Sequence, residues 1–112
     1  MYLVERYLPG FTEEELRAAC LRVREAAMAA TGRGVPVAHV SSAFLPLEES
    51  VFCLFEGGSA DDVRSVTEAA AFPFERITEV LLLTPGDLPE PLASASPSDQ
   101  ATADRRRSAE EA

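Results

Sequence analysis

The chain has 112 residues, 46% of them hydrophobic and 26% charged, a composition that suits one domain with a small core. Its formal net charge of -9 argues against a nucleic acid or an anionic membrane as a partner, because both need a basic surface. No stretch approaches the roughly 20 apolar residues of a membrane helix and no secretory signal follows Met1, so we expect a soluble cytoplasmic protein.

The first third of the chain predicts a strand followed by a long helix. Residues 2–8 are rich in Tyr, Val and Leu, as strands are. Thr12 begins the motif TEEEL, a capping box with Thr12 as the N-cap and Glu15 at the third helical position. An apolar stripe continues to Ala30 and Gly32 follows it, so we expect about five turns of helix, enough to cover one face of a small sheet.

Residues 35–56 predict two strands joined by a turn, and they carry the one histidine of the chain. Pairing Phe44 with Val51 sets the register of this hairpin. The same register places His39 opposite Glu56, on the face that the alternating apolar residues do not use. Those apolar residues are Val40 and Phe44 in the first strand and Val51, Cys53 and Phe55 in the second.

The remaining sequence predicts a second helix, a fourth strand and a tail. Ser59 follows a glycine pair and caps a helix that Pro73 stops. Residues 76–83 form the last strand, and their leucine-rich end indicates burial on both faces. The chain then becomes rich in Pro, Ala, Ser and charge without apolar periodicity, so we expect one domain over residues 1–83 and a disordered tail over residues 84–112.

The order strand, helix, strand, strand, helix, strand predicts an α+β fold of the ferredoxin-like βαββαβ type. Right-handed crossovers place two helices on one face of a four-stranded antiparallel sheet and leave the other face open. Apolar side chains on an open face need a partner, so we expect a homodimer whose sheets pack face to face, as in a dimeric α+β barrel, with a cleft near His39. The apolar residues assigned to the open face are Leu3, Phe52, Leu54 and part of the run 81–83.

The cysteines and the common catalytic motifs give little direction. Cys20 falls on the helix stripe and Cys53 on the core face of a strand, so both are expected to be buried thiols. Their separation does not match the spacing of zinc-binding cysteines. The sequence contains no glycine-rich nucleotide loop, no GxSxG elbow and no HExxH helix. It therefore does not decide whether the protein is an enzyme.

Four segments of the chain resemble a family of small bacterial domains of unknown function. They are YLVERYLPGFTEEEL near the N-terminus, AHVSS around His39, VFCLFEGGSADDV, and FPFERITEV. Members of this family include nickel-binding proteins with a dimeric ferredoxin-like fold. The resemblance covers residues 1–83, and its most specific parts are the CLFE segment and the ending formed by Pro73, Ile77 and Val80.

The resemblance implies a metal site that includes His39. A single histidine needs oxygen ligands beside it, and Glu5 and Glu56 are the carboxylates that could share its face. One nitrogen and two carboxylates can hold nickel, zinc, iron or manganese, and ligand type alone does not choose among these metals. We therefore expect a small metal-binding homodimer, with nickel as the divalent metal that the resemblance names.

Two other kinds of function stay open for the same cleft. One is a small cofactor-free enzyme of the oxygenase or isomerase type, or a ligand-binding dimer, in which His39 serves a small-molecule ligand as acid or base. It predicts an enclosed apolar pocket of at least about 300 Å³ around His39. The other is a purely structural dimer in which His39 supports the interface. The His39→Ala variant separates the three, because it removes a metal, a ligand or dimer stability.

Overall fold

The structure is a computed structural model that describes residues 1–91, and the chain divides into two units, residues 1–82 and residues 83–112. Residues 92–112, the larger part of the predicted disordered tail, lie outside the described residues, and that assignment stays a prediction. In the second unit, the described residues include one short 3₁₀ turn, Pro85–Asp87, which begins with a capping box at Thr84. Neither helix of the described residues is long and apolar enough to cross a membrane.

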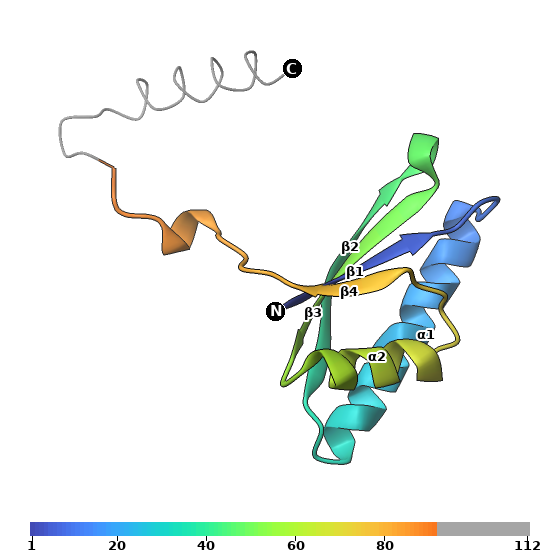
Figure 1. Ribbon diagram of the computed structural model, residues 1–112, viewed down its shortest axis with the longest axis horizontal. Helices are drawn as coiled ribbons and strands as arrows, with labels where there is room; N and C mark the ends of the chain where they lie inside the picture. The colour runs from blue at the N-terminus through green and yellow to red at the C-terminus, as the bar shows by residue number, and fades with distance from the viewer. Residues whose placement is uncertain (92–112) are drawn as a thin grey trace. The chain divides into compact units, whose positions relative to one another are not determined.

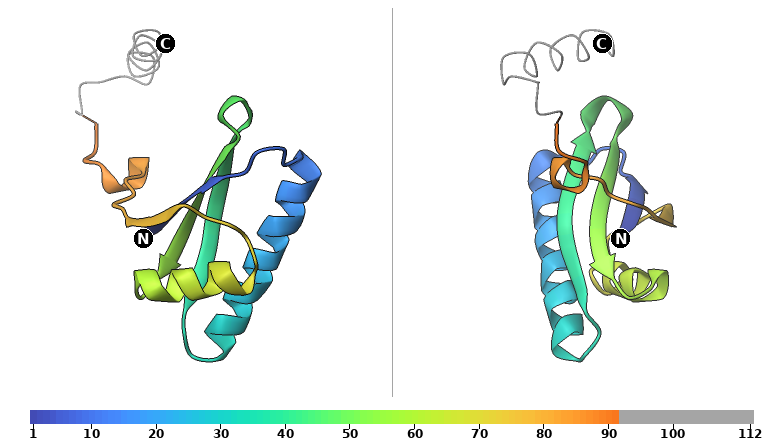
Figure 2. Two further views of the ribbon diagram at one scale, coloured as in Figure 1. Left: turned by 45° about the vertical axis from the view of Figure 1, so that its right-hand side comes forward. Right: turned by 90° about the vertical axis from the view of Figure 1, so that its left-hand side faces the viewer.

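The first unit is built from six elements in the predicted order (Figure 1). Strand order in the sheet is β2-β3-β1-β4, and every neighbouring pair is antiparallel, which confirms the ferredoxin-like βαββαβ fold. Both helices lie on the same side of the sheet (Figure 2). The elements are β1 Tyr2–Tyr7, α1 Glu13–Gly32, β2 Val37–Leu45, β3 Ser50–Gly57, α2 Ala60–Ala69 and β4 Arg76–Glu79, with a 3₁₀ turn Pro46–Glu48 between β2 and β3.

Both predicted helix starts are confirmed by side-chain caps. Thr12 and Glu15 form the reciprocal capping box of α1, in which the Glu15 N–H donates to Thr12 Oγ1 at 3.1 Å. Ser59 accepts the Asp62 N–H at 3.1 Å and so begins α2. These bonds satisfy backbone donors that have no partner within the helix, and they fix where each helix begins.

Helix α2 ends earlier than predicted, because a Schellman-type turn closes it before Pro73. The N–H groups of Ala71 and Phe72 donate to the carbonyls of Glu68 and Thr67 at 3.0 and 3.3 Å. Ala71 occupies the left-handed region with φ of 54°, a conformation in which glycine is usual. The turn directs Phe72 back into the core, where 2% of its surface is exposed.

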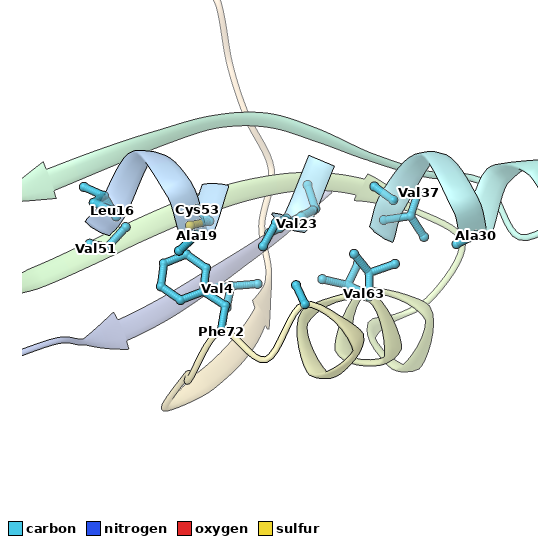
Figure 3. Packing of buried hydrophobic residues seen from close by; sticks show 14 of the residues in the cluster. Val4, Leu16, Ala19, Val23, Ala30, Val37, Val51, Cys53, Val63 and Phe72 are labelled. Carbon is cyan, nitrogen blue, oxygen red and sulfur yellow. The ribbon is translucent and has the colours of Figure 1, made fainter. Parts of the chain in front are cut away.

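Side chains from both layers form one core between the sheet and the helices (Figure 3). Packing of this kind supplies most of the stability of a small domain, at about 25 cal/mol for each Å² of apolar surface removed from water. One charged residue, Arg6, lies within this core. The buried apolar members include Val4, Val51, Cys53 and Phe55 from the sheet, Leu16, Ala19 and Val23 from α1, Val63 and Val66 from α2, and Phe72.

Strand β4 is shorter than predicted and ends at Glu79 instead of residue 83. Its partner β1 begins at Tyr2, which pairs with Glu79, so the ladder has no backbone left to continue on. The Val80 N–H still donates to the Met1 carbonyl at 3.0 Å, and there the pairing stops. The leucines that follow are exposed within the described chain, not buried on both faces as their composition predicted.

A β-bulge in β2 changes which face His39 occupies. Phe44 pairs with Val51 as predicted, but Val40 has no partner, and His39 pairs with Phe55. The predicted pairing of His39 with Glu56 is therefore wrong. Because an extra residue reverses the alternation of side chains, His39 turns to the helix-covered face of the sheet instead of the open face.

Candidate functional site

His39 lies at the edge of the core, between β2 and α1. Its ring packs against that of buried Phe55, with 5.2 Å between the ring centroids. Its Nε2 atom is 2.7 Å from the Oγ atom of Ser42, three residues further along β2. The bulge at Val40 brings the two side chains to the same face, since residues three apart on a regular strand point to opposite faces.

The hydroxyl of Ser42 is the meeting point of a polar cluster that joins β2, β3 and α1. Ser42 Oγ donates to the Sγ atom of Cys53 on β3 at 3.1 Å. Cys20 on α1 donates from its Sγ atom to Ser42 Oγ at 3.8 Å, a distance within hydrogen-bond range for sulfur. One oxygen atom thus contacts the imidazole and both thiols of the chain. We call His39, Ser42, Cys53 and Cys20 the Ser42 cluster.

Arg6 extends this cluster into the core. Only 1% of its surface is exposed, and its Nε atom donates to Cys53 Sγ at 3.3 Å. Its other nitrogens donate to the Phe72 carbonyl at 2.8 Å and to Thr67 Oγ1 at 2.9 Å. The guanidinium also lies 3.8 Å from the centre of the Phe72 ring, in a cation–π contact. A buried charge needs partners of this number, because it has lost its water.

The sulfur of Cys53 is the one ionisable group that Arg6 contacts in the described residues. The ion pairs found in residues 1–91 join Arg17 to Glu13 and Arg76 to Glu5, so no carboxylate neutralises Arg6 there. A thiolate at Cys53 would place a negative charge against the guanidinium in a medium of low dielectric constant. The pairing therefore favours the thiolate form of this cysteine.

The two thiols have opposite acidities. Burial opposes ionisation of Cys53, but hydrogen bonding from His39 together with the charge and hydrogen bond of Arg6 outweigh it, so the pKa of Cys53 lies below its ordinary value. Burial is the main reason that the pKa of Cys20 is raised instead, although Ser42 opposes this rise. Cys53 is therefore the more acidic thiol of the pair.

Ser42 can pass a proton between Cys53 and His39. A hydroxyl has one hydrogen and can accept others, so when Ser42 donates to Cys53 it accepts from Nε2–H of His39. When it donates to Nε2 instead, Cys53 must keep its own proton. The cluster consequently links the charge of a buried sulfur to the state of an imidazole nearer the surface.

The Ser42 cluster borders a pocket of about 500 Å³ between β2 and α1. His39, Ser42 and Cys20 line the pocket, whereas Cys53 lies behind Ser42 and does not. Charged side chains of α1 complete much of the wall, together with apolar side chains of both elements. The charged residues are Glu13, Arg17 and Arg24. Solutes can therefore reach the imidazole and one thiol of the cluster.

The predicted carboxylate ligands lie away from His39. Glu5 lies on the open face of β1, where it pairs with Arg76 of β4. Glu56 is exposed on β3 and lies opposite Ala38, so it also belongs to the open face. The described part of one chain does not bring the three predicted ligands together. Across residues 1–91, no three or more His, Cys, Asp or Glu side chains are arranged as a metal site.

Sequence reasoning missed Arg6 and Ser42. Arg6 occupies the same strand face as Val4, which is fully buried, so the alternation of β1 already places a charge in the core. That signal points to a buried polar network, because a buried arginine needs partners. Burial of Cys53 was predicted and is confirmed, while Cys20 is only partly buried. No pattern in the sequence indicates that the two thiols approach one hydroxyl.

The fold and the cluster define a class of protein: a small ferredoxin-like α+β domain with an imidazole and two thiols where α1 meets the sheet. Residues 2–80 match the family described as nickel responsive protein SCO4226-like, and the chain belongs to that family. The crystal structure of SCO4226 from Streptomyces coelicolor A3(2) is similar, with a TM-score of 0.61 and 25% sequence identity over 74% of this chain and 98% of that one. None of the curated proteins matches the chain. The family resemblance read from the sequence is thereby confirmed.

Proposed function

We propose that this protein binds nickel and that His39 is one of the ligands. Membership of a family described as nickel responsive supports a metal-related role. The position of His39 is the observation that carries the proposal, because the one imidazole of the chain lies on the wall of a pocket that an ion can enter. Imidazole nitrogen suits nickel, zinc, copper and iron, and manganese prefers oxygen ligands. The donors near His39 therefore favour nickel or zinc over manganese.

The carboxylates proposed from the sequence are poor partners for His39 within one chain. Glu5 and Glu56 point from the open face, and His39 points from the helix-covered face. Glu5 already has a cation beside it in Arg76. A nickel ion held by His39 must take its other ligands from the pocket side, from water or from a bound small molecule.

We also propose that the protein is a cytoplasmic homodimer that joins through the open sheet face. Leu3, Phe52 and Leu54 lie on that face, and no described residue covers it with another layer. Packing two such faces would remove these side chains from water. The helices separate His39 from this face, so the dimer cleft and the His39 pocket would be different sites. Two free cysteines agree with a reducing compartment.

Metal content of the untagged protein tests the nickel proposal. Protein loaded with nickel and dialysed should hold near-stoichiometric metal by elemental mass spectrometry, and the His39→Ala variant should lose it. The Glu56→Gln variant is the matched control, because it neutralises a predicted ligand on the other face and should keep the metal. Equal nickel in His39→Ala and the unchanged protein would remove His39 from the proposal.

Light scattering tests the dimer. A Leu54→Glu variant places a charge in the centre of the open face and should halve the molar mass. Leu47→Glu is the control, because Leu47 is fully exposed at the hairpin turn and away from the sheet face. A dimer that survives Leu54→Glu would contradict the proposed interface.

A small-molecule site is the second candidate function, favoured by the pocket itself. Its volume of about 500 Å³ falls within the usual range of ligand sites, about 300–1,000 Å³. The predicted pocket was enclosed and apolar, but charged side chains of α1 line this one. A ligand with both an anionic group and an apolar part would suit that wall. A fragment screen by NMR, repeated on the His39→Gln variant, would locate any such ligand.

A further inference from the structure

The imidazole and both thiols of the chain surround a single oxygen atom. His39 Nε2, Cys53 Sγ and Cys20 Sγ lie 2.7, 3.1 and 3.8 Å from Ser42 Oγ. They come from three different elements, β2, β3 and α1, which the packed core holds in place. Three donors held around one point by a rigid core form the framework of a metal site, and here a hydroxyl fills that point.

The Ser42 hydroxyl explains why these donors do not form a metal site as they stand. Bonds from a metal are about 2.0–2.1 Å to a histidine nitrogen and about 2.3 Å to a thiolate sulfur, taking zinc as the reference. The three distances to Ser42 Oγ exceed those lengths by less than about 2 Å. The donors can converge only after the serine turns its hydroxyl away, a rotation about one side-chain bond.

The chemistry of these donors suits a borderline or soft cation. Thiolate sulfur and imidazole nitrogen are ligands for nickel, zinc and copper, and hard cations such as magnesium prefer oxygen. Arg6 donates to Cys53 Sγ from the core side, an outer hydrogen bond of the kind that orients and tunes a metal-bound thiolate. The pocket gives an ion access to His39, Ser42 and Cys20 from the other side.

We infer that nickel binds to His39, Cys20 and Cys53 at the place that the Ser42 hydroxyl fills, so that Ser42 competes with the metal. The inference rests on the proposed function and names the ligands that complete its site. On binding, each thiol forms a bond from sulfur to nickel and gives up its proton to water. The imidazole binds through the lone pair of neutral Nε2, and the Ser42 hydroxyl moves out of the cluster.

Nickel titration of the reduced, metal-free, full-length protein tests this inference by absorbance. Thiolate bound to nickel gives charge-transfer absorption in the near ultraviolet, which imidazole and carboxylate ligands do not give. The band should appear in the unchanged protein and be lost in Cys53→Ser and Cys20→Ser. Affinity in each variant should fall by at least about 100-fold, since loss of even an outer partner costs 10- to 100-fold. Cys20 is only partly buried, so its variant remains informative if Cys53→Ser does not fold.

Two adjacent serines provide the sharpest comparison. Ser42→Ala removes the competing hydroxyl and leaves the donors unpaired in the metal-free state, so nickel should bind about tenfold more tightly. Ser41→Ala is the matched control, because Ser41 pairs with Leu54 and belongs to the open face. Equal affinity in these two variants would overturn the competition between Ser42 and the metal.

The outcomes separate the inference from the function on which it rests. Nickel that binds through His39 without a charge-transfer band would overturn the thiol ligands and leave the proposed function standing. A protein that binds no nickel would overturn both. A band that needs His39, Cys20 and Cys53, and strengthens in Ser42→Ala, is the result expected.

Discussion

The rings of His39 and Phe55 lie 5.2 Å apart on the helix-covered face of the sheet, where the two residues are direct partners in the β2–β3 ladder. Phe55 is fully buried, so this contact anchors the imidazole to the core and leaves its Nε2 atom directed at Ser42. The site thus depends on a residue that takes no part in its chemistry. The unpaired Val40 is what makes the contact possible.

Deletion of Val40 should destabilise the protein severely. Without the extra residue, either Val37 leaves the core or the ladder shifts throughout, because a one-residue slip turns every side chain to the other face. Exposing buried residues on this scale should cost more than about 3 kcal/mol in urea unfolding. Val40→Ala keeps the bulge and removes only a half-exposed side chain, so it should cost less than about 1 kcal/mol. Similar losses in the two variants would show that the bulge does not set the register.

Replacement of Arg6 by methionine should destabilise the fold and also change the thiol chemistry. The variant keeps much of the side-chain volume but leaves Thr67 and the Phe72 carbonyl without their donor. We expect a loss of about 2–4 kcal/mol in the free energy of unfolding. Cys53 should become a weaker acid in the same variant. Arg17→Met, on the exposed surface of α1, is the control and should leave both properties unchanged. An Arg6→Met protein as stable as this control would contradict the role given to the buried cation.

The pH dependence of stability should distinguish the two thiols in the metal-free protein. The folded-state pKa of Cys53 is lowered, so its contribution to stability is complete above the unfolded value of about 8.5 and is lost as pH falls through the folded value. The stability gap between the unchanged protein and Cys53→Ser should therefore widen as pH rises toward that point. The groups that face this sulfur are Arg6, His39, Ser42 and Cys20.

Cys20 should behave in the opposite way, because its folded-state pKa is raised. Its stabilising contribution is present below the unfolded value and is lost as pH rises through the folded value. The gap between the unchanged protein and Cys20→Ser should narrow at alkaline pH. Urea unfolding of both variants across this pH range checks the pair, and parallel curves would contradict the assigned acidities.

Ala71→Gly should stabilise the protein. Ala71 adopts a left-handed φ of 54° at the end of α2, a conformation that costs a residue with a Cβ atom about 1 kcal/mol. Glycine removes this cost, although it also gains entropy in the unfolded chain, so we expect a net gain of about 0.5 kcal/mol. Ala69→Gly is the matched control, since Ala69 is helical and exposed, and it should lose about 0.5–1 kcal/mol. A thermal midpoint that falls in both variants would refute the prediction.

The order of the elements, the helix caps and most of the core were predictable from the sequence, because they depend on local patterns. Thr12 and Ser59 cap their helices through bonds to residues three positions further on. The alternation of Val51, Cys53 and Phe55 identified the buried face of β3 from its period alone. Such signals need no knowledge of distant parts of the chain.

The site depended on tertiary structure. Val37 and Phe44 both pack toward the helices, yet they are an odd number of positions apart, and a regular strand cannot place both on one face. The core imposes an extra residue between them, and this bulge carries His39 away from Glu56 and toward the thiols. The sequence by itself determined the fold and the family resemblance. Only the packing of α1 against the sheet decided that His39, Cys20 and Cys53 meet at Ser42, because no local pattern records a contact between three separate elements.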